Sequence, residues 1–154
     1  GTIRDNLMFG CPDATEEQIA EALVISQAKE FVDTKEGRLD AVVEQGGKNL
    51  SGGQRQRLTL ARALVPQSDI LIMDDSASAL DYATDAKLRK AIQNMKRKPT
   101  VFIVSQRTSS IQDADSILVL DDGKIAGKGT HEELIASCDI YREIYETQFK
   151  KEEA

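Results

Sequence analysis

The fold is decided by Leu50-Ser51-Gly52-Gly53-Gln54-Arg55-Gln56-Arg57 and, farther along the chain, Ile70-Leu71-Ile72-Met73-Asp74-Asp75. Two glycines directly before a helix leave backbone N–H groups bare, and the helix dipole directs its positive end at the same place. With a serine hydroxyl alongside, this arrangement suits an anion such as phosphate. Taken alone, however, a Gly-Gly pair at a helix start is more often structural.

The residues around these stretches predict a layered α/β fold. Residues 53–64 favour a helix that Pro66 ends, and the apolar run at 70–73 is typical of a buried parallel strand that delivers acids to its C-terminal edge. Helices are also expected at residues 16–31, 81–95 and from 130 onward, a second buried strand at 101–104, and a hairpin around Asp121-Asp122-Gly123. Alternating strands and helices indicate an α/β core.

Three motifs in this order resemble those of one family. Leu50-Ser51-Gly52-Gly53-Gln54 matches the signature motif of ATP-binding cassette (ABC) transporters at every position, and Ile70-Leu71-Ile72-Met73-Asp74 resembles the Walker B strand. Ser78-Ala79-Leu80-Asp81 is identical to the family's D-loop. The resemblance implies the second half of a P-loop NTPase-like (RecA-like) core together with the ABC α-helical subdomain. The helical subdomain, with X-loop and signature, is expected at residues 1–62, and the half core, with Walker B, D-loop and H-loop region, at 63–154.

Two further segments resemble the exporter class. Residues 1–7 are similar to the segment that follows the Q-loop in exporters, and Glu44-Gln45-Gly46-Gly47 is similar to the exporter X-loop. The resemblance implies that ATP binding and hydrolysis drive transport at the cytoplasmic face of a membrane. It also implies an ABC transmembrane domain as partner, expected on the same parent chain.

The phosphate-binding loop of the family, G-x-x-x-x-G-K-[ST], is absent from the sequence. Gly47-Lys48-Asn49 lacks the upstream glycine, and Asn49 stands in place of the hydroxyl residue that binds magnesium. We therefore expect that the chain is the C-terminal part of the domain and is inactive on its own. The strand edges and apolar faces left without neighbours are expected to favour self-association.

The resemblance assigns roles to individual residues, with ATP and Mg²⁺ as the bound species. Asp74 takes the place of the residue that binds Mg²⁺, and Asp75 and Gln106 take the catalytic places. The nucleotide-contacting places are taken by Leu50, Ser51, Gly52, Gly53, Gln54, Ser78 and Asp81.

Both catalytic places depart from the family pattern. Active members have Glu where this chain has Asp75, which is one methylene shorter, and general-base catalysis is worth ~10²–10⁴-fold. They have Ala-His-Arg where this chain has Ser105-Gln106-Arg107, and the Gln106 amide donates a hydrogen bond but carries no proton or charge. The two changes together resemble the degenerate half of a heterodimeric exporter. Because ABC domains pair head to tail, the intact signature would complete the site of a second, distinct nucleotide-binding domain.

Composition narrows the alternatives. A net charge of −6 disfavours a nucleic-acid partner, and Cys11 and Cys138, far apart and outside any C-x-x-C pattern, are expected as free thiols. No apolar run approaches the roughly 18–20 residues that span a bilayer.

His131 is expected at a plain capping or surface position, and Arg55, Arg57 and Arg62 are expected to be solvated or salt-bridged. A soluble ABC-type ATPase that acts on nucleic acid or ribosomes and an inert structural piece remain as alternative readings.

Overall fold

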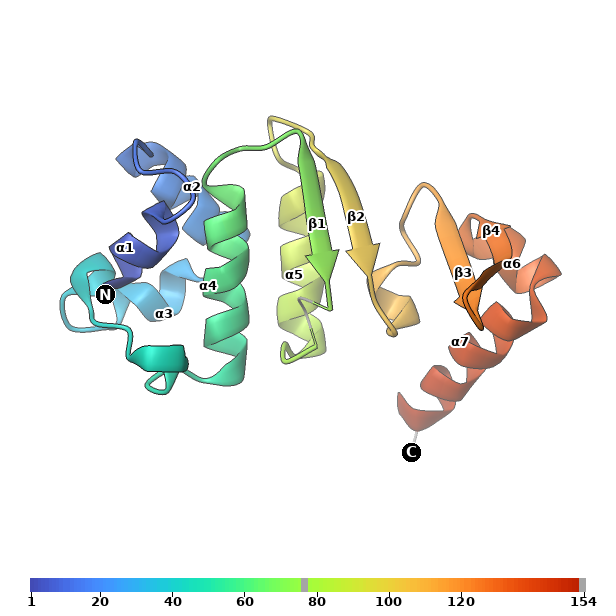
Figure 1. The fold of residues 1–154 in the computed structure, drawn as a ribbon. Helices are drawn as coiled ribbons and strands as arrows, with labels where there is room; N and C mark the ends of the chain where they lie inside the picture. The colour runs from blue at the N-terminus through green and yellow to red at the C-terminus, as the bar shows by residue number, and fades with distance from the viewer. Residues whose placement is uncertain (76–77, 153–154) are drawn as a thin grey trace. The chain divides into compact units, whose positions relative to one another are not determined.

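A computed structural model describes residues 1–75 and 78–152, and the chain divides into two compact units (Figure 1). The first unit covers residues 1–104 and the second begins at residue 105. Cys11 and Cys138 are both free thiols, as predicted. None of the helices in residues 1–75 and 78–152 is long and apolar enough to cross a membrane.

The first unit contains five α-helices, two 3₁₀ helices and two strands within its described residues. In chain order they are α1 (Ile3–Met8), α2 (Glu16–Ile25), α3 (Lys29–Asp33), η1 (Arg38–Asp40), η2 (Gln45–Gly47), α4 (Gly52–Leu64), β1 (Ile70–Asp74), α5 (Tyr82–Gln93) and β2 (Thr100–Val104). Helix α4 follows its predicted range and packs against α1 and α2.

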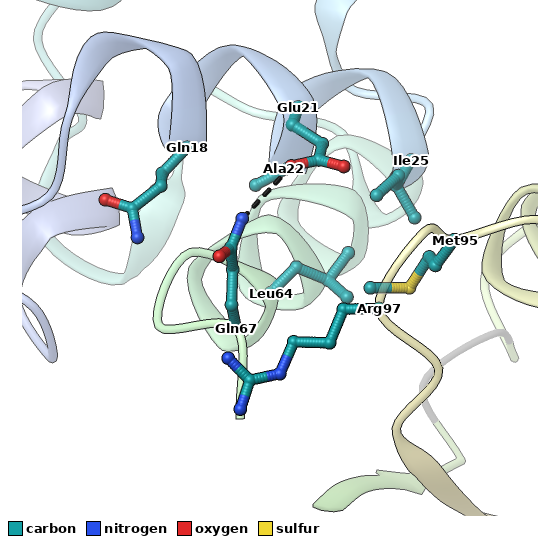
Figure 2. A pocket seen from close by; sticks show the side chains of 8 residues that line it. All are labelled: Gln18, Glu21, Ala22, Ile25, Leu64, Gln67, Met95 and Arg97. Carbon is teal, nitrogen blue, oxygen red and sulfur yellow. Dashed lines mark hydrogen bonds between the residues drawn. The ribbon is translucent and has the colours of Figure 1, made fainter. Parts of the chain in front are cut away.

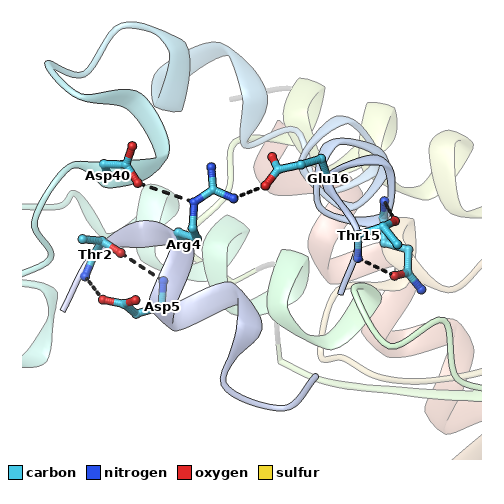
Figure 3. A network of polar contacts seen from close by, with 7 residues as sticks. Thr2, Arg4, Asp5, Thr15, Glu16 and Asp40 are labelled. Carbon is cyan, nitrogen blue, oxygen red and sulfur yellow. Dashed lines mark hydrogen bonds and ion pairs between the residues drawn. The ribbon is translucent and has the colours of Figure 1, made fainter. Parts of the chain in front are cut away.

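Capping boxes fix the starts of α1 and α2 (Figure 3). The Thr15 hydroxyl accepts a hydrogen bond from the Gln18 N–H, and the Gln18 side chain accepts one from the Thr15 N–H. Thr2 and Asp5 form the same arrangement in α1, a helix that the sequence analysis missed. Arg4, on α1, forms an ion pair with Glu16 at the start of α2, and this pair ties the two helices together.

The single helix predicted over residues 16–31 is wrong. Helix α2 ends at Ile25, Gln27 adopts a left-handed conformation with φ 59°, and α3 begins at Lys29. A contact from elsewhere in the chain holds the break. The Arg57 guanidinium donates to the Gln27 carbonyl at 2.9 Å and lies 5.0 Å from the centre of the Phe31 ring.

Strands β1 and β2 are parallel, in a register that pairs Asp74 with Val104 at their C-terminal ends. Parallel pairing confirms the expectation, but the prediction that both strands are fully buried is wrong. Leu71 and Met73 face the core, whereas Ile72 is 68% exposed on the opposite face and Phe102 is 56% exposed. Only one face of this pair is covered by described residues, on the side where α5 runs alongside it (Figure 1).

The second unit contains the predicted hairpin and two helices in its described part. Its elements are η3 (Thr108–Ser110), β3 (Ile117–Asp121), β4 (Lys124–Gly129), α6 (His131–Ser137) and α7 (Asp139–Glu152). Asp122 and Gly123 both have positive φ, at 45° and 73°, as a two-residue hairpin turn of type I′ requires. The hairpin and helices enclose a small core of Ile117, Val119, Leu134, Cys138 and Tyr141.

His131 is a packing residue, which corrects the prediction of a plain capping or surface position. Thr130 caps α6, and the His131 ring lies 2.9 Å from the Tyr141 hydroxyl through its Nδ1 atom. The same ring packs on Tyr145 with centroids 5.0 Å apart. His131 therefore joins the start of α6 to α7.

Candidate functional site

Ser51 caps helix α4, and this cap uses two of the residues predicted to bind nucleotide. The Ser51 hydroxyl accepts from the Gln54 N–H at 3.2 Å, and the Gln54 side chain accepts from the Ser51 N–H at 3.1 Å. Both side chains therefore have a structural role in starting the helix. Within residues 1–75 and 78–152 each of these oxygen atoms accepts a single hydrogen bond, so each keeps a further lone pair.

The amides of Gly52 and Gly53 remain free at the same helix end. Within the described chain neither N–H has a hydrogen-bond partner, as expected for the first turn of a helix. A side chain on Gly53 would bring its Cβ within 3.2 Å of the Ala79 carbonyl oxygen, whereas one on Gly52 would reach only ordinary contact with the Ala79 side chain at 3.5 Å. Gly53 thus lets the backbone of Ala79 approach closely. It also keeps a free backbone N–H.

Gln56 joins this helix to the D-loop, a role that the sequence analysis missed. Its side-chain amide donates to the Ser78 hydroxyl at 2.9 Å and, more weakly, to the Asp75 carbonyl at 3.4 Å. Its side-chain oxygen accepts from the Ala79 N–H at 2.9 Å. Its spacing could have indicated this role, because Gln56 lies four residues after Gly52 and three after Gly53 and so shares a helix face with them.

The acidic pair lies at the C-terminal end of β1, where the parallel pairing places it. Asp74 is exposed, and in residues 1–75 and 78–152 its carboxylate takes part in no hydrogen bond or ion pair. Asp75 has φ 46°, a left-handed conformation that Asp tolerates better than most residues. Its N–H donates to the Val104 carbonyl at 3.0 Å, and its carbonyl accepts from the Ser78 N–H at 3.2 Å.

Asp81 serves as the N-cap of α5. Its two carboxylate oxygens accept from the Thr84 N–H and the Thr84 hydroxyl, both at 2.8 Å. The hydrogen bond from the Thr84 backbone, followed by the one from its hydroxyl, lowers the pKa of Asp81 below the ordinary value of an aspartate. A charged cap at a helix start is also favoured by the helix dipole.

Gln106 belongs to the second unit and is exposed there. The loop around it is held by hydrogen bonds to its backbone. The Ser105 hydroxyl accepts from the Arg107 N–H at 3.0 Å, and the Gln106 carbonyl accepts from the side-chain amide of Gln148 at 2.5 Å.

Comparison with known proteins matches this arrangement to one family. The family model described as ABC transporter matches residues 2–78 of the 154, a range that contains the capped glycine helix and the strand with its acidic pair. The chain belongs to the ABC transporter family. The α/β fold of the P-loop NTPase-like class is thereby confirmed.

Curated ABC proteins resemble the chain along nearly all of its length. An ATP-dependent lipid A-core flippase of Shewanella frigidimarina is 41% identical over 97% of this chain and 25% of the relative. A beta-(1→2)glucan export ATP-binding/permease protein of Rhodopseudomonas palustris is 41% identical over 99% of this chain and 26% of the relative. The chain thus spans about a quarter of the length of these relatives.

A solved ABC structure also matches the fold. The structure of a bacterial ABC exporter with ATP bound has a TM-score of 0.91 and 32% identity, covering 96% of this chain and 26% of that one. Like the curated relatives, the solved structure matches nearly all of this chain and about a quarter of its own length.

Arg55 and Arg57 of helix α4 both donate hydrogen bonds to backbone carbonyls. Arg55 and Arg62 are exposed, as predicted, whereas Arg57 is half-buried over the Phe31 ring, which corrects the prediction for that residue. Arg55 donates to the Leu50 carbonyl at 2.9 Å and to the Gly47 carbonyl at 3.3 Å. Gly47 has φ 65°, and a Cβ there would lie 2.7 Å from the Arg55 side chain. Arg55 therefore fastens the segment that resembles the X-loop to the start of α4.

The Gly47-Lys48-Asn49 stretch lies in a loop that the Asn49 side chain holds to the preceding residues. The Asn49 side-chain amide donates to the Val42 carbonyl at 2.8 Å, and its oxygen accepts from the Glu44 N–H at 3.1 Å. This use of Asn49 agrees with the sequence argument that the stretch is not the family's phosphate-binding loop.

A shallow hollow lies elsewhere in the first unit (Figure 2). Gln67 and Glu21 close one side of it through a hydrogen bond of 3.1 Å. None of the residues predicted to bind ATP or Mg²⁺ lines it, and its lining residues are Gln18, Glu21, Ala22, Ile25, Leu64, Gln67, Met95 and Arg97. The structure also gathers no group of three metal-binding side chains among residues 1–75 and 78–152.

Proposed function

We propose that this chain is part of the ATP-binding and ATPase domain of an ABC exporter, which couples ATP binding and hydrolysis to movement of a substrate across a membrane. The names of the flippase and the glucan export protein support this reading over an ATPase that acts on nucleic acid or ribosomes. The net charge of −6 supports it further. The partner is a transmembrane domain of the same parent protein, and the domain lies at the cytoplasmic face of the membrane.

The function divides between two faces of the domain. Leu50, Ser51, Gly52, Gly53 and Gln54 complete the ATP site of a second, distinct nucleotide-binding domain, with Ser78 and Asp81 contributing from the D-loop. The single observation that carries this proposal is the pair of free Gly52 and Gly53 amides at a capped helix start, which suits a phosphate. Residues 1–62 are the helical subdomain, and residues 63–154 are the second half of the core.

The subunit's own ATP site is slow or inactive. Asp74 offers an exposed carboxylate, the kind of ligand that Mg²⁺ prefers, and magnesium there would neutralise phosphate charge. Asp75 has a short side chain on a backbone pinned to Val104 and Ser78, so it is poorly placed to reach an attacking water. Gln106 can donate a hydrogen bond to a terminal phosphate but cannot transfer a proton.

One pair of substitutions in the full-length protein tests the division. Ser51→Asp keeps an N-cap acceptor but sets a negative charge against phosphate, so ATP hydrolysis should fall by at least about 10-fold. Asp75→Asn should leave hydrolysis within about twofold, because the own site contributes little. The matched control is Arg62→Ala, an exposed change on the same helix. Equal and large losses in the Ser51 and Asp75 variants would contradict the division.

A second experiment tests degeneracy directly. The double variant Asp75→Glu with Gln106→His restores the residues of active members, and turnover at the own site should rise by roughly 10-fold or more. Mass spectrometry of the purified full-length protein should find a distinct ABC half in equal amount. A lone homodimer that hydrolyses ATP would show that Asp75 supports catalysis. The chain by itself, without a phosphate-binding loop, should not hydrolyse ATP.

A further inference from the structure

We propose that Gln148, on the C-terminal helix α7, is a positioning residue that holds the loop carrying Gln106 in the conformation needed to sense a terminal phosphate. The inference has two parts. The first, that Gln148 holds the loop, rests only on contacts within the second unit. The second, that the held loop senses a phosphate, rests on the proposed function, because it takes Gln106 as the residue at the phosphate.

Three hydrogen bonds from one side chain hold the loop. The Gln148 side-chain oxygen accepts from the Thr108 N–H at 2.9 Å and from the Thr108 hydroxyl at 3.0 Å. The Gln148 amide nitrogen donates to the Gln106 carbonyl at 2.5 Å. One side chain therefore binds the backbone on both sides of Arg107.

The chemistry of these partners selects an amide. A backbone N–H only donates and a backbone carbonyl only accepts, so the side chain at 148 must offer an acceptor to Thr108 and a donor to Gln106 at the same time. Glutamine does so. Glutamate would keep the acceptor but would turn a second oxygen toward the Gln106 carbonyl, and alanine would offer neither group.

The loop has reason to depend on this support. Thr108 is only 4% exposed, so its hydroxyl is largely shielded from water that could replace Gln148. Losing the partner of a buried polar group costs more than losing one in solvent. A further hydrogen bond, which the Ser105 hydroxyl accepts from the Arg107 N–H, is local to the loop and so does not replace its link to α7.

Helix α7 packs against the core of the second unit. Tyr141 is buried in the core and contacts His131, and Tyr145 packs on the same ring. Gln148 follows Tyr141 and Tyr145 at intervals of seven and three residues, which are helical repeats of one face. The C-terminal helix therefore transmits the position of the core to the backbone of Gln106.

The test compares Gln148→Ala and Gln148→Glu with Glu146→Ala, an exposed change on the same helix, in the full-length protein. Hydrogen-exchange mass spectrometry of peptides covering residues 105–110 should show exchange about 10-fold faster in both Gln148 variants and unchanged in the control. ATP and ADP dissociation constants are then measured with Ser51→Asp also present, so that binding reports on this subunit's own site. We expect the constant for ATP to rise about 3–10-fold and that for ADP to stay the same.

The outcomes separate the two parts. Unchanged exchange at residues 105–110 would overturn the positioning role, and faster exchange with an unchanged ratio of ATP to ADP affinity would reduce Gln148 to a structural residue and overturn the inference. Absence of nucleotide binding in the protein with native Gln148 would overturn the proposed function and the phosphate-sensing part. The exchange measurement would still decide whether Gln148 holds the loop.

Discussion

Gln56 on the signature helix donates a hydrogen bond to the Ser78 hydroxyl at 2.9 Å, and its oxygen accepts from the neighbouring Ala79 N–H at the same distance. Two segments that lie apart in the sequence, helix α4 and the residues that resemble the D-loop, are thereby joined to each other. Gly53 adds to the junction, since a Cβ at this position would lie 3.2 Å from the Ala79 carbonyl oxygen, which is tighter than most Cβ contacts.

Replacing Gln56 by alanine should loosen this junction. We expect the free energy of unfolding to fall by about 1 kcal/mol, because hydrogen bonds of a half-buried side chain are lost. Exchange of the Ala79 amide should become faster. Arg62→Ala, on the exposed side of α4, serves as control and should change unfolding by less than about 0.5 kcal/mol. Urea unfolding and hydrogen exchange measure both effects, and an unchanged Ala79 amide would show that the contact does not persist in solution.

The two signature glycines should respond differently to alanine. Gly52→Ala gains helix propensity and meets only ordinary contact at 3.5 Å, whereas Gly53→Ala places a methyl group 3.2 Å from the Ala79 carbonyl oxygen. We expect Gly53→Ala to be less stable than Gly52→Ala by roughly 1 kcal/mol. Thermal unfolding of the two variants side by side provides the comparison. Equal melting temperatures would mean that the D-loop moves away at little cost.

Asp81 should make stability depend on acid pH. Its pKa is lowered in the folded protein, chiefly by the hydrogen bond from the Thr84 backbone, so folding favours the charged form. The stabilisation is present above the ordinary aspartate pKa and is lost as the pH falls through the folded-state value. Denaturant unfolding of the protein and of Asp81→Asn should therefore differ near neutral pH and converge in acid. A constant difference across this range would rule out the charged cap as its source.

The bare face of β1 and β2 should drive self-association of the chain, a further proposal. Ile72, Phe102 and their neighbours place apolar side chains in solvent on that face. Ile72→Lys should shift the chain toward monomer in light scattering at high concentration, while Val24→Lys, an exposed apolar position on α2, should not. If the unsubstituted chain is a monodisperse monomer at high concentration, the proposal is contradicted.

Much of this chain could be read from local sequence. Helix α4 begins at the glycine pair and ends before Pro66, Asp122-Gly123 turns the hairpin, and the apolar run before Asp74 forms a parallel strand, each as predicted. These features depend on residues within a few positions of one another, whose backbone preferences and hydrogen bonds are nearly independent of the rest of the fold.

Other features required the tertiary structure, because their physical cause lies far along the chain. The helix expected across Gln27 is interrupted in the structure, where Arg57 binds the Gln27 carbonyl from α4. Gln56 and Gln148 carry no motif of their own, and only packing brings their amides to Ser78 and Gln106. Side-chain hydrogen bonds act over about 3 Å, so a sequence can show that an amide is available but not which backbone group it will meet. By itself the sequence determined the family and predicted its motifs and their departures at Asp75 and Gln106, whereas the tertiary structure decided which residues hold those segments in place.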